Sequence, residues 1–139
     1  YGKVGNDDEY NSIRARFGDS TDPAAQLQAL RLLGLQAEFE QKLSIADLDR
    51  ETSSGRPVLV GWLHHGSYRT PSGSGHWSVV VGTDATSVIH NDPYGMADVV
   101  NGGYKSAQGG KYVHYSKQYW LPRWLVEGAN SGWGVLINQ

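Results

Sequence analysis

The chain contains no cysteine among its 139 residues. This absence excludes disulfide bonds and cysteine-ligated metal centres, and it leaves no thiol to act as a nucleophile. It does not fix a cellular compartment, because the reduced cytosol and export without disulfides both permit it. The composition therefore leaves the localisation open.

Long apolar runs and a strong charge of either sign are also absent. No stretch approaches the roughly 20 apolar residues of a membrane-spanning helix, and no basic segment followed by an apolar core is visible at the first residues. Lys and Arg number 12 against 14 Asp and Glu, a formal net charge of −2. No strong electric field favours nucleic acid or an anionic membrane. We expect neither a membrane span nor a nucleic-acid partner, and the oligomeric state stays open.

The residues that are present predict one domain over residues 1–139. Apolar spacing and cap residues predict helices over residues 6–17, 22–34 and 44–52, with a short strand at 37–41. After residue 55 the pattern changes to apolar runs separated by glycine-rich loops. Helices followed by a mostly antiparallel sheet indicate an α+β fold.

The predicted sheet contains residues 57–63, 76–82, 86–91 and 132–137. The first of these is a continuous apolar run, which is typical of a strand buried on both faces. Residues 83–86 predict a turn that joins two strands into a hairpin. A further short strand is expected at 112–115, followed by a helix capped by Ser116, and the segments 66–75 and 101–110 read as loops.

His76 and Asp92 are the candidate catalytic residues. His76 follows Gly75 and opens one strand, and Asp92 ends the next strand, sixteen residues later. If the intervening turn makes a hairpin, the far ends of the two strands lie together. The Asp carboxylate then accepts the Nδ1 proton of the imidazole and stabilises the imidazolium. The alternative is a polar residue at a strand end and an Asp that caps a turn.

Trp77 and Tyr94 are the candidates for contact with substrate. Trp77 directly follows His76 and would shield the His76–Asp92 pair from water. Tyr94, with Tyr104, Trp120 and Trp124, would line a cleft for a peptide or glycan. The alternative for all of these rings is packing in an aromatic core.

His64 and His65 raise the question of a metal site, because three imidazoles can hold a catalytic zinc. Together with His76 and His90 they place four imidazoles near the loop ends of the sheet. Adjacent residues of a continuing strand point to opposite faces, so His64 and His65 would not easily bind one ion. We expect residues that line a cleft, with no metal and no cofactor.

Three motifs together resemble a known family. They are Gly55-Arg56-Pro57-Val58-Leu59-Val60-Gly61-Trp62, then Gly75-His76-Trp77-Ser78-Val79-Val80-Val81-Gly82, then His90-Asn91-Asp92-Pro93. This pattern resembles the papain-like cysteine peptidases of the bacteriocin-leader-processing (double-glycine) type and their stand-alone relatives. The resemblance implies a papain-like fold, with His76 as catalytic base and Asp92 as its orienting residue. It also implies peptide-bond hydrolysis.

The chain departs from that family at the nucleophile. The family's Cys opens a central helix ahead of all the motifs, after a Gln or Asn that helps bind the oxyanion, and this chain contains no Cys. Tyr1-Gly2-Lys3 resembles the last turn of an earlier helix, which suggests that the nucleophile helix belongs upstream. The leading hypothesis is a cysteine peptidase or amidase domain without its Cys, acting on a peptide or a peptidoglycan-derived substrate. The alternative is a catalytically inactive binding or structural module in an exported or virus-associated assembly.

Overall fold

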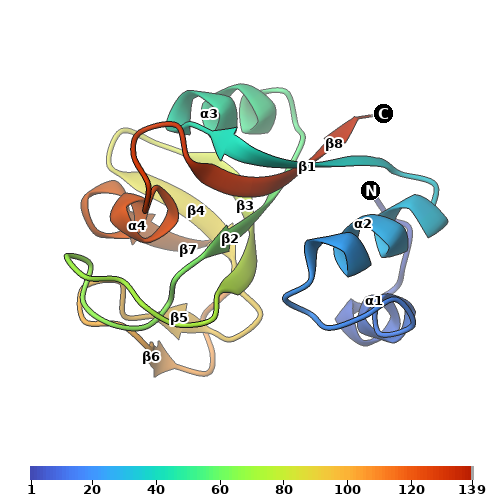
Figure 1. Ribbon diagram of the computed structural model, residues 1–139, viewed down its shortest axis with the longest axis horizontal. Coiled ribbons are helices and arrows are strands. Elements are labelled where there is room, and N and C mark those ends of the chain that lie inside the picture. The colour runs from blue at the N-terminus through green and yellow to red at the C-terminus, as the bar shows by residue number, and fades with distance from the viewer. Residues whose placement is uncertain (139) are drawn as a thin grey trace.

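A computed structural model describes residues 1–138, which form a six-stranded antiparallel sheet with helices on both faces (Figure 1). Along the sheet the strand order is β1-β8-β2-β3-β4-β7, and β5 pairs with β6 in a separate hairpin. The predicted α+β fold is confirmed. In chain order the elements are α1 (Asp7–Arg14), α2 (Pro23–Leu32), β1 (Gln36–Leu43), α3 (Ile45–Ser53), β2 (Val58–Trp62), β3 (His76–Thr83), β4 (Ser87–Asn91), β5 (Met96–Ala97), β6 (Tyr104–Ser106), β7 (Val113–Ser116), α4 (Lys117–Trp124) and β8 (Gly132–Asn138).

The first three helices begin where the cap residues predict. The side chains of Asn6 and Asp22 accept hydrogen bonds from backbone N–H groups in the first turns of α1 and α2. Ser44 and Asp47 form a reciprocal capping box at the start of α3. α1 ends at Arg14, earlier than predicted, because residues 15–17 continue only as hydrogen-bonded turns. The predicted Gly stop after α2 is confirmed, since Gly34 has a φ of +80°.

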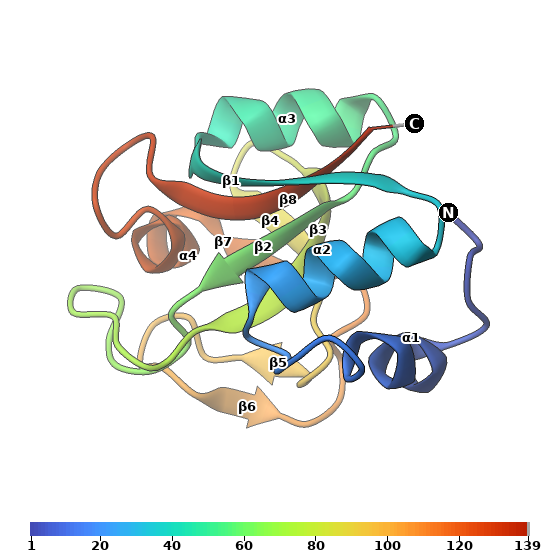
Figure 2. The ribbon, with the colours of Figure 1, turned by 45° about the vertical axis from the view of Figure 1, so that its right-hand side comes forward.

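Each face of the sheet has its own hydrophobic cluster. α3 and α4 cover one face, where the larger cluster includes Val60, Trp62 and Trp120. α2 covers the other face at β1, over a smaller cluster around Val135. α1 has no buried residue and lies against α2, on the side of the molecule that Figure 2 brings forward. α1 therefore borders the sheet without packing tightly against it.

The hairpin of β3 and β4 positions the candidate catalytic residues, and its predicted turn is confirmed. The Asp84 carboxylate accepts the backbone N–H groups of Thr86 and Ser87 at 2.9 and 2.7 Å and so stabilises the turn. The strands pair antiparallel with a bulge between Val80 and Gly82. This register brings the start of β3 beside the end of β4.

Three further local predictions differ from the structure. The loop predicted at 101–110 contains β6, which pairs with β5. β2 is not fully buried on both faces: Val58, Val60 and Trp62 are buried, whereas the intervening residues are only partly covered, because α1 stands away from that face. Ser116 precedes α4 as predicted, but its side chain makes no capping hydrogen bond. Within residues 1–138 no helix has the length and apolarity that crossing a bilayer requires.

Candidate functional site

His76 and Asp92 form a buried hydrogen-bonded pair where β3 begins and β4 ends. The Nε2 of His76 lies 2.9 Å from Oδ1 of Asp92, and the two side chains are 4% and 0% exposed. The prediction that Asp92 binds Nδ1 is wrong, because the carboxylate meets the ring at its distal nitrogen. Nδ1, the nitrogen nearer the main chain, is thereby left as the position at which the imidazole can take up or release a proton.

The imidazole of His76 is held between two aromatic rings. Trp62 packs edge-on at a centroid distance of 5.3 Å, and Tyr94 lies over the ring at 4.5 Å with an interplanar angle of 31°. Tyr94 is itself 57% exposed, so its outer face meets solvent. Rings on both sides restrict rotation of the imidazole, which a general base requires.

Trp77 does not shield the pair as expected, because adjacent strand residues point to opposite faces of the sheet. Its ring packs against Phe39 at 6.3 Å, and its indole N–H reaches the carbonyl of Thr21 at 3.4 Å. The shielding role falls to Trp62 on the neighbouring strand. Trp77 instead lines the cleft described below.

The Asp92 carboxylate is ionised in spite of its burial. It accepts hydrogen bonds from His76, from the backbone N–H of Tyr94 at 3.0 Å, and from the hydroxyls of Tyr104 and Tyr115. Burial raises the pKa of Asp92, but the bonds from His76 and Tyr115 and from the Tyr94 N–H outweigh it, so the pKa lies below its ordinary value. The site thus holds a fixed negative charge behind the imidazole.

A buried chain of hydrogen bonds links Trp62 to Ser78 and His90. The indole N–H of Trp62 donates to Oγ of Ser78 at 2.9 Å, and Oγ of Ser78 lies 2.8 Å from Nδ1 of His90. Oγ of Ser78 and Nδ1 of His90 share one hydrogen, and the tautomer of the His90 ring decides which of the two atoms donates it. The second ring nitrogen of His90 is Nε2. That nitrogen has no hydrogen-bond partner among the described residues. Burial lowers the pKa of His90 to about 3, so the ring is neutral.

His64 and His65 lie beside the pair, just beyond the end of β2. Their ring centroids are 4.0 Å apart, so the expectation that they point to opposite faces is wrong. The reason is that β2 ends at Trp62, and the chain no longer alternates as a strand does. Burial and the neighbouring imidazoles of His65 and His76 lower the pKa of His64 to about 4. In the part of the chain that the structure describes, no three His, Asp or Glu side chains are grouped so as to hold a metal ion.

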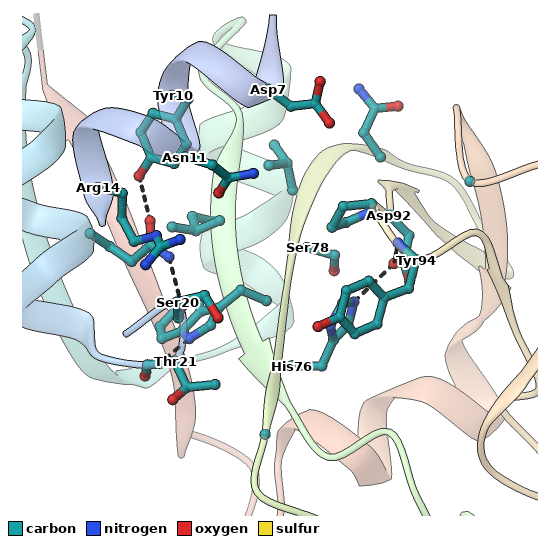
Figure 3. A pocket seen from close by; sticks show the side chains of 18 of the residues that line it. Asp7, Tyr10, Asn11, Arg14, Ser20, Thr21, His76, Ser78, Asp92 and Tyr94 are labelled. Carbon is teal, nitrogen blue, oxygen red and sulfur yellow. Dashed lines mark hydrogen bonds and ion pairs between the residues drawn. The ribbon is translucent and has the colours of Figure 1, made fainter. Parts of the chain in front are cut away.

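A cleft of about 730 Å³ opens beside His76, between α1 and the sheet (Figure 3). Asp7, Tyr10, Asn11 and Arg14 line it from the side of α1, and Figure 3 shows His76, Asp92 and Tyr94 across from them. Leu59, Trp77 and Val79 add an apolar wall from β2 and β3. A smaller hollow of about 280 Å³ adjoins the cleft at Gly75, His76 and Trp77. The buried His76–Asp92 pair therefore borders a cleft large enough for a polypeptide segment.

Comparison with known proteins places this arrangement in a family. The sequence model of the family described as papain-like cysteine protease AvrRpt2 matches residues 6–101, well over half of the chain. The chain belongs to this family. The predicted resemblance to papain-like cysteine peptidases is confirmed.

A solved structure shows the same papain-like fold. It is a protein described as a C39-like peptidase from Bacillus anthracis, which matches with a TM-score of 0.54 and 17% sequence identity. The match covers 84% of this chain and 58% of that one, so the chain spans less than two thirds of the structure it resembles. No curated protein sequence matches the chain.

Three residues of this papain-like site have no clear signal in the sequence. Tyr104 was expected only as one of several cleft aromatics, whereas its hydroxyl bonds Asp92. Tyr115 and Arg123 were not expected at the site at all. Both are buried, and their polar groups meet partners more than twenty residues away in sequence. The fold alone brings such partners together, and spacing along the chain does not reveal them.

Proposed function

We propose that this domain, residues 1–139, supplies the catalytic base and its orienting carboxylate for a papain-like cysteine peptidase or amidase. His76 is the base, and Asp92 orients it. The supporting observation is the buried bond between His76 Nε2 and Asp92 Oδ1, which leaves Nδ1 for proton transfer. The thiol lies outside these 139 residues, since the chain contains no Cys.

In the proposed reaction, the cysteine supplies the nucleophile and this domain supplies the base. The cysteine thiol gives its proton to Nδ1 of His76, and the thiolate sulfur attacks the carbonyl carbon of the scissile bond. His76 then returns the proton to the leaving amine as the C–N bond breaks, and water hydrolyses the thioester. The Asp92 charge stabilises the imidazolium between these transfers. Because both side chains are buried, the attraction between the imidazolium and the Asp92 carboxylate is screened less than it would be in water.

The large cleft supports this proposal by offering room beside His76. Its wall at Leu59, Trp77 and Val79 is apolar and only partly covered. A cysteine-bearing segment that packs on this wall would lie in the same cleft that His76 borders. We infer a peptide or peptidoglycan-derived substrate, with Trp77 and Tyr94 in contact with it at the borders of the cleft.

The decisive experiment begins with the complete coding region and the peptide hydrolysis of its product. We expect a cysteine in the gene product and hydrolysis that falls at least about 100-fold in His76→Ala, the usual size of a general-base contribution. His114→Ala is the matched control, because His114 has an exposed side chain on β7. A gene product without cysteine, or hydrolysis that is indifferent to His76→Ala, would overturn the proposal.

A second function is favoured by the absence of Cys from the chain. The domain then acts as a catalytically inactive binding or structural module, for example in an exported or virus-associated assembly. In that case the cleft binds a peptide ligand, and His76→Ala leaves its affinity unchanged. Isothermal titration calorimetry of the wild type and of His76→Ala with the same peptide ligand separates the two functions, since a catalytic base is not required for binding.

A further inference from the structure

The Asp92 carboxylate is hydrogen-bonded on both of its oxygens from different sides. Oδ1 meets Nε2 of His76 at 2.9 Å and the backbone N–H of Tyr94 at 3.0 Å. Oδ2 accepts the hydroxyls of Tyr115 at 2.7 Å and Tyr104 at 2.9 Å. His76 therefore uses one oxygen, while two phenols hold the other. A carboxylate held only at Oδ1 would be free to rotate out of line with the imidazole.

Tyr115 points its hydroxyl at Asp92 from a fixed position in the core. The residue lies on β7 and is 1% exposed. Its oxygen accepts the backbone N–H of Ala97 at 3.0 Å, so the one phenolic hydrogen is free for a carboxylate. That hydrogen has a nearer acceptor in Asp92 Oδ2, at 2.7 Å, than in the carbonyl of Gly95, at 3.3 Å. The direction of the hydroxyl is thus set by its surroundings.

Tyr104 reaches the same carboxylate from the separate β5–β6 hairpin. Its hydroxyl lies 2.9 Å from Oδ2 and 3.1 Å from Oδ1 of Asp92, and its ring centroid is 5.8 Å from that of His76. The hairpin is tied to the segment after β2, because the N–H of Gly103 donates to the carbonyl of His64 at 2.7 Å. The hairpin therefore brings a hydroxyl to the site at a defined place.

The two phenols meet Asp92 as hydrogen-bond donors. Burial and the adjacent charge of Asp92 raise the pKa of Tyr104 and of Tyr115 well above the ordinary value for a tyrosine. Both hydroxyls therefore keep their protons throughout the neutral range, and neither takes part in proton transfer. The hydrogen bond from Tyr115 opposes the effect of burial on the pKa of Asp92, since burial alone would favour the neutral acid. Tyr104 adds a second hydroxyl, 2.9 Å from the same carboxylate oxygen. A neutral acid would not stabilise an imidazolium.

We propose that Tyr104 and Tyr115 are positioning residues for the His76–Asp92 pair. Their hydroxyls keep the Asp92 carboxylate ionised and hold Oδ1 in line with Nε2 of His76. The catalytic consequence rests on the proposed function of His76 as base. By this assignment the β5–β6 hairpin contributes to the catalytic site, although the residues of the hairpin lie outside all three family motifs.

The test is a titration of the Asp92 carboxyl carbon by NMR in the 139-residue chain. Tyr104→Phe and Tyr115→Phe each remove one donor and keep the ring, so we expect each to raise the pKa of Asp92 by about one unit. Tyr119→Phe is the matched control, because Tyr119 is half-buried like Tyr104 but packs against Tyr68. We expect that variant to titrate like the wild type.

An Asp92 titration that stays the same in Tyr104→Phe and Tyr115→Phe overturns the proposal. If Tyr115→Phe does not fold, the half-buried Tyr104→Phe decides alone. A purely structural contact would lower the free energy of unfolding without moving the titration. The measurement needs no thiol, so the proposal stands if peptide hydrolysis proves independent of His76. Conversely, an unmoved titration refutes the tyrosine assignment and leaves the proposed function of His76 intact.

Discussion

Arg123 is the residue whose replacement we expect to destabilise the fold most. It extends from α4, is 1% exposed, and donates to four main-chain carbonyls instead of a carboxylate. These bonds join the segment after β2 to the connection between β5 and β6, the two segments that border the site. The acceptors are Val99 at 2.7 Å, Leu63 at 3.3 Å, His65 at 3.2 Å and Gly66 at 2.7 Å.

The expected fall in the free energy of unfolding follows from these contacts. A hydrogen bond from a charged donor contributes about 1.5–3 kcal/mol, so the two bonds of 2.7 Å together contribute about 3–6 kcal/mol. Removing a buried cation also removes its desolvation cost, which offsets part of that loss. For Arg123→Met we expect the free energy of unfolding to fall by about 4 kcal/mol. Arg123→Lys keeps the charge but not the fork of donors, and we expect a loss of about half that size.

Urea unfolding followed by circular dichroism measures both losses. In a domain of this size 1 kcal/mol corresponds to about 4 °C in Tm, so Arg123→Met should also lower Tm by about 15 °C. Arg69→Met is the control, because Arg69 is exposed and its guanidinium carbon lies over the ring of Tyr68. We expect that change to stay within about 0.5 kcal/mol of the wild type. A loss below about 1 kcal/mol in Arg123→Met would refute the argument.

Three further changes test other parts of the account. Burial lowers the pKa of His90 to about 3, whereas the imidazole in the unfolded chain binds a proton below about pH 6.5. The free energy of unfolding should therefore fall by up to about 1.4 kcal/mol per pH unit as the pH drops from 6.5 towards 3. Urea unfolding at a series of pH values should show a shallower fall in His90→Asn. Asp92→Asn removes a charge bonded by four donors, and we expect a loss of about 2–3 kcal/mol at pH 7. The loss should shrink as the pH falls below the ordinary pKa of a carboxyl towards the lowered pKa of Asp92, where the folded wild type is protonated as well; a loss that does not change with pH would contradict this. Gly132→Ala places a Cβ 2.3 Å from the buried ring of Trp124 and should cost about 1–3 kcal/mol, whereas the exposed Gly5→Ala should be neutral in the same unfolding assay.

The sequence predicted those parts of the fold that depend on local signals. Helix starts at Asn6, Asp22 and Ser44 follow from side chains that bond backbone N–H groups within three residues. The hairpin that joins β3 and β4 follows from a turn and two apolar runs. Because a hairpin fixes which strand ends meet, the proximity of His76 and Asp92 was also predictable.

The remaining features depend on contacts between distant segments. Which nitrogen of His76 meets Asp92 depends on how far the carboxylate extends beyond the strand end. Trp62 rather than Trp77 shields the imidazole, because the parity of each residue along its strand decides the face that it occupies. The bonds of Tyr115 to Asp92 join positions 23 residues apart. No local pattern encodes such pairings.

The rate of cysteine alkylation by iodoacetamide in the complete gene product tests the central claim most directly. A free thiol of ordinary pKa, about 8.5, is almost entirely protonated at pH 6 and reacts slowly. If His76 is the base for that thiol, alkylation at pH 6 should stay fast in the wild type and in the control His114→Ala. It should slow at least about tenfold in His76→Ala. Equal rates in the wild type and His76→Ala, or a gene product without any cysteine, would contradict the account.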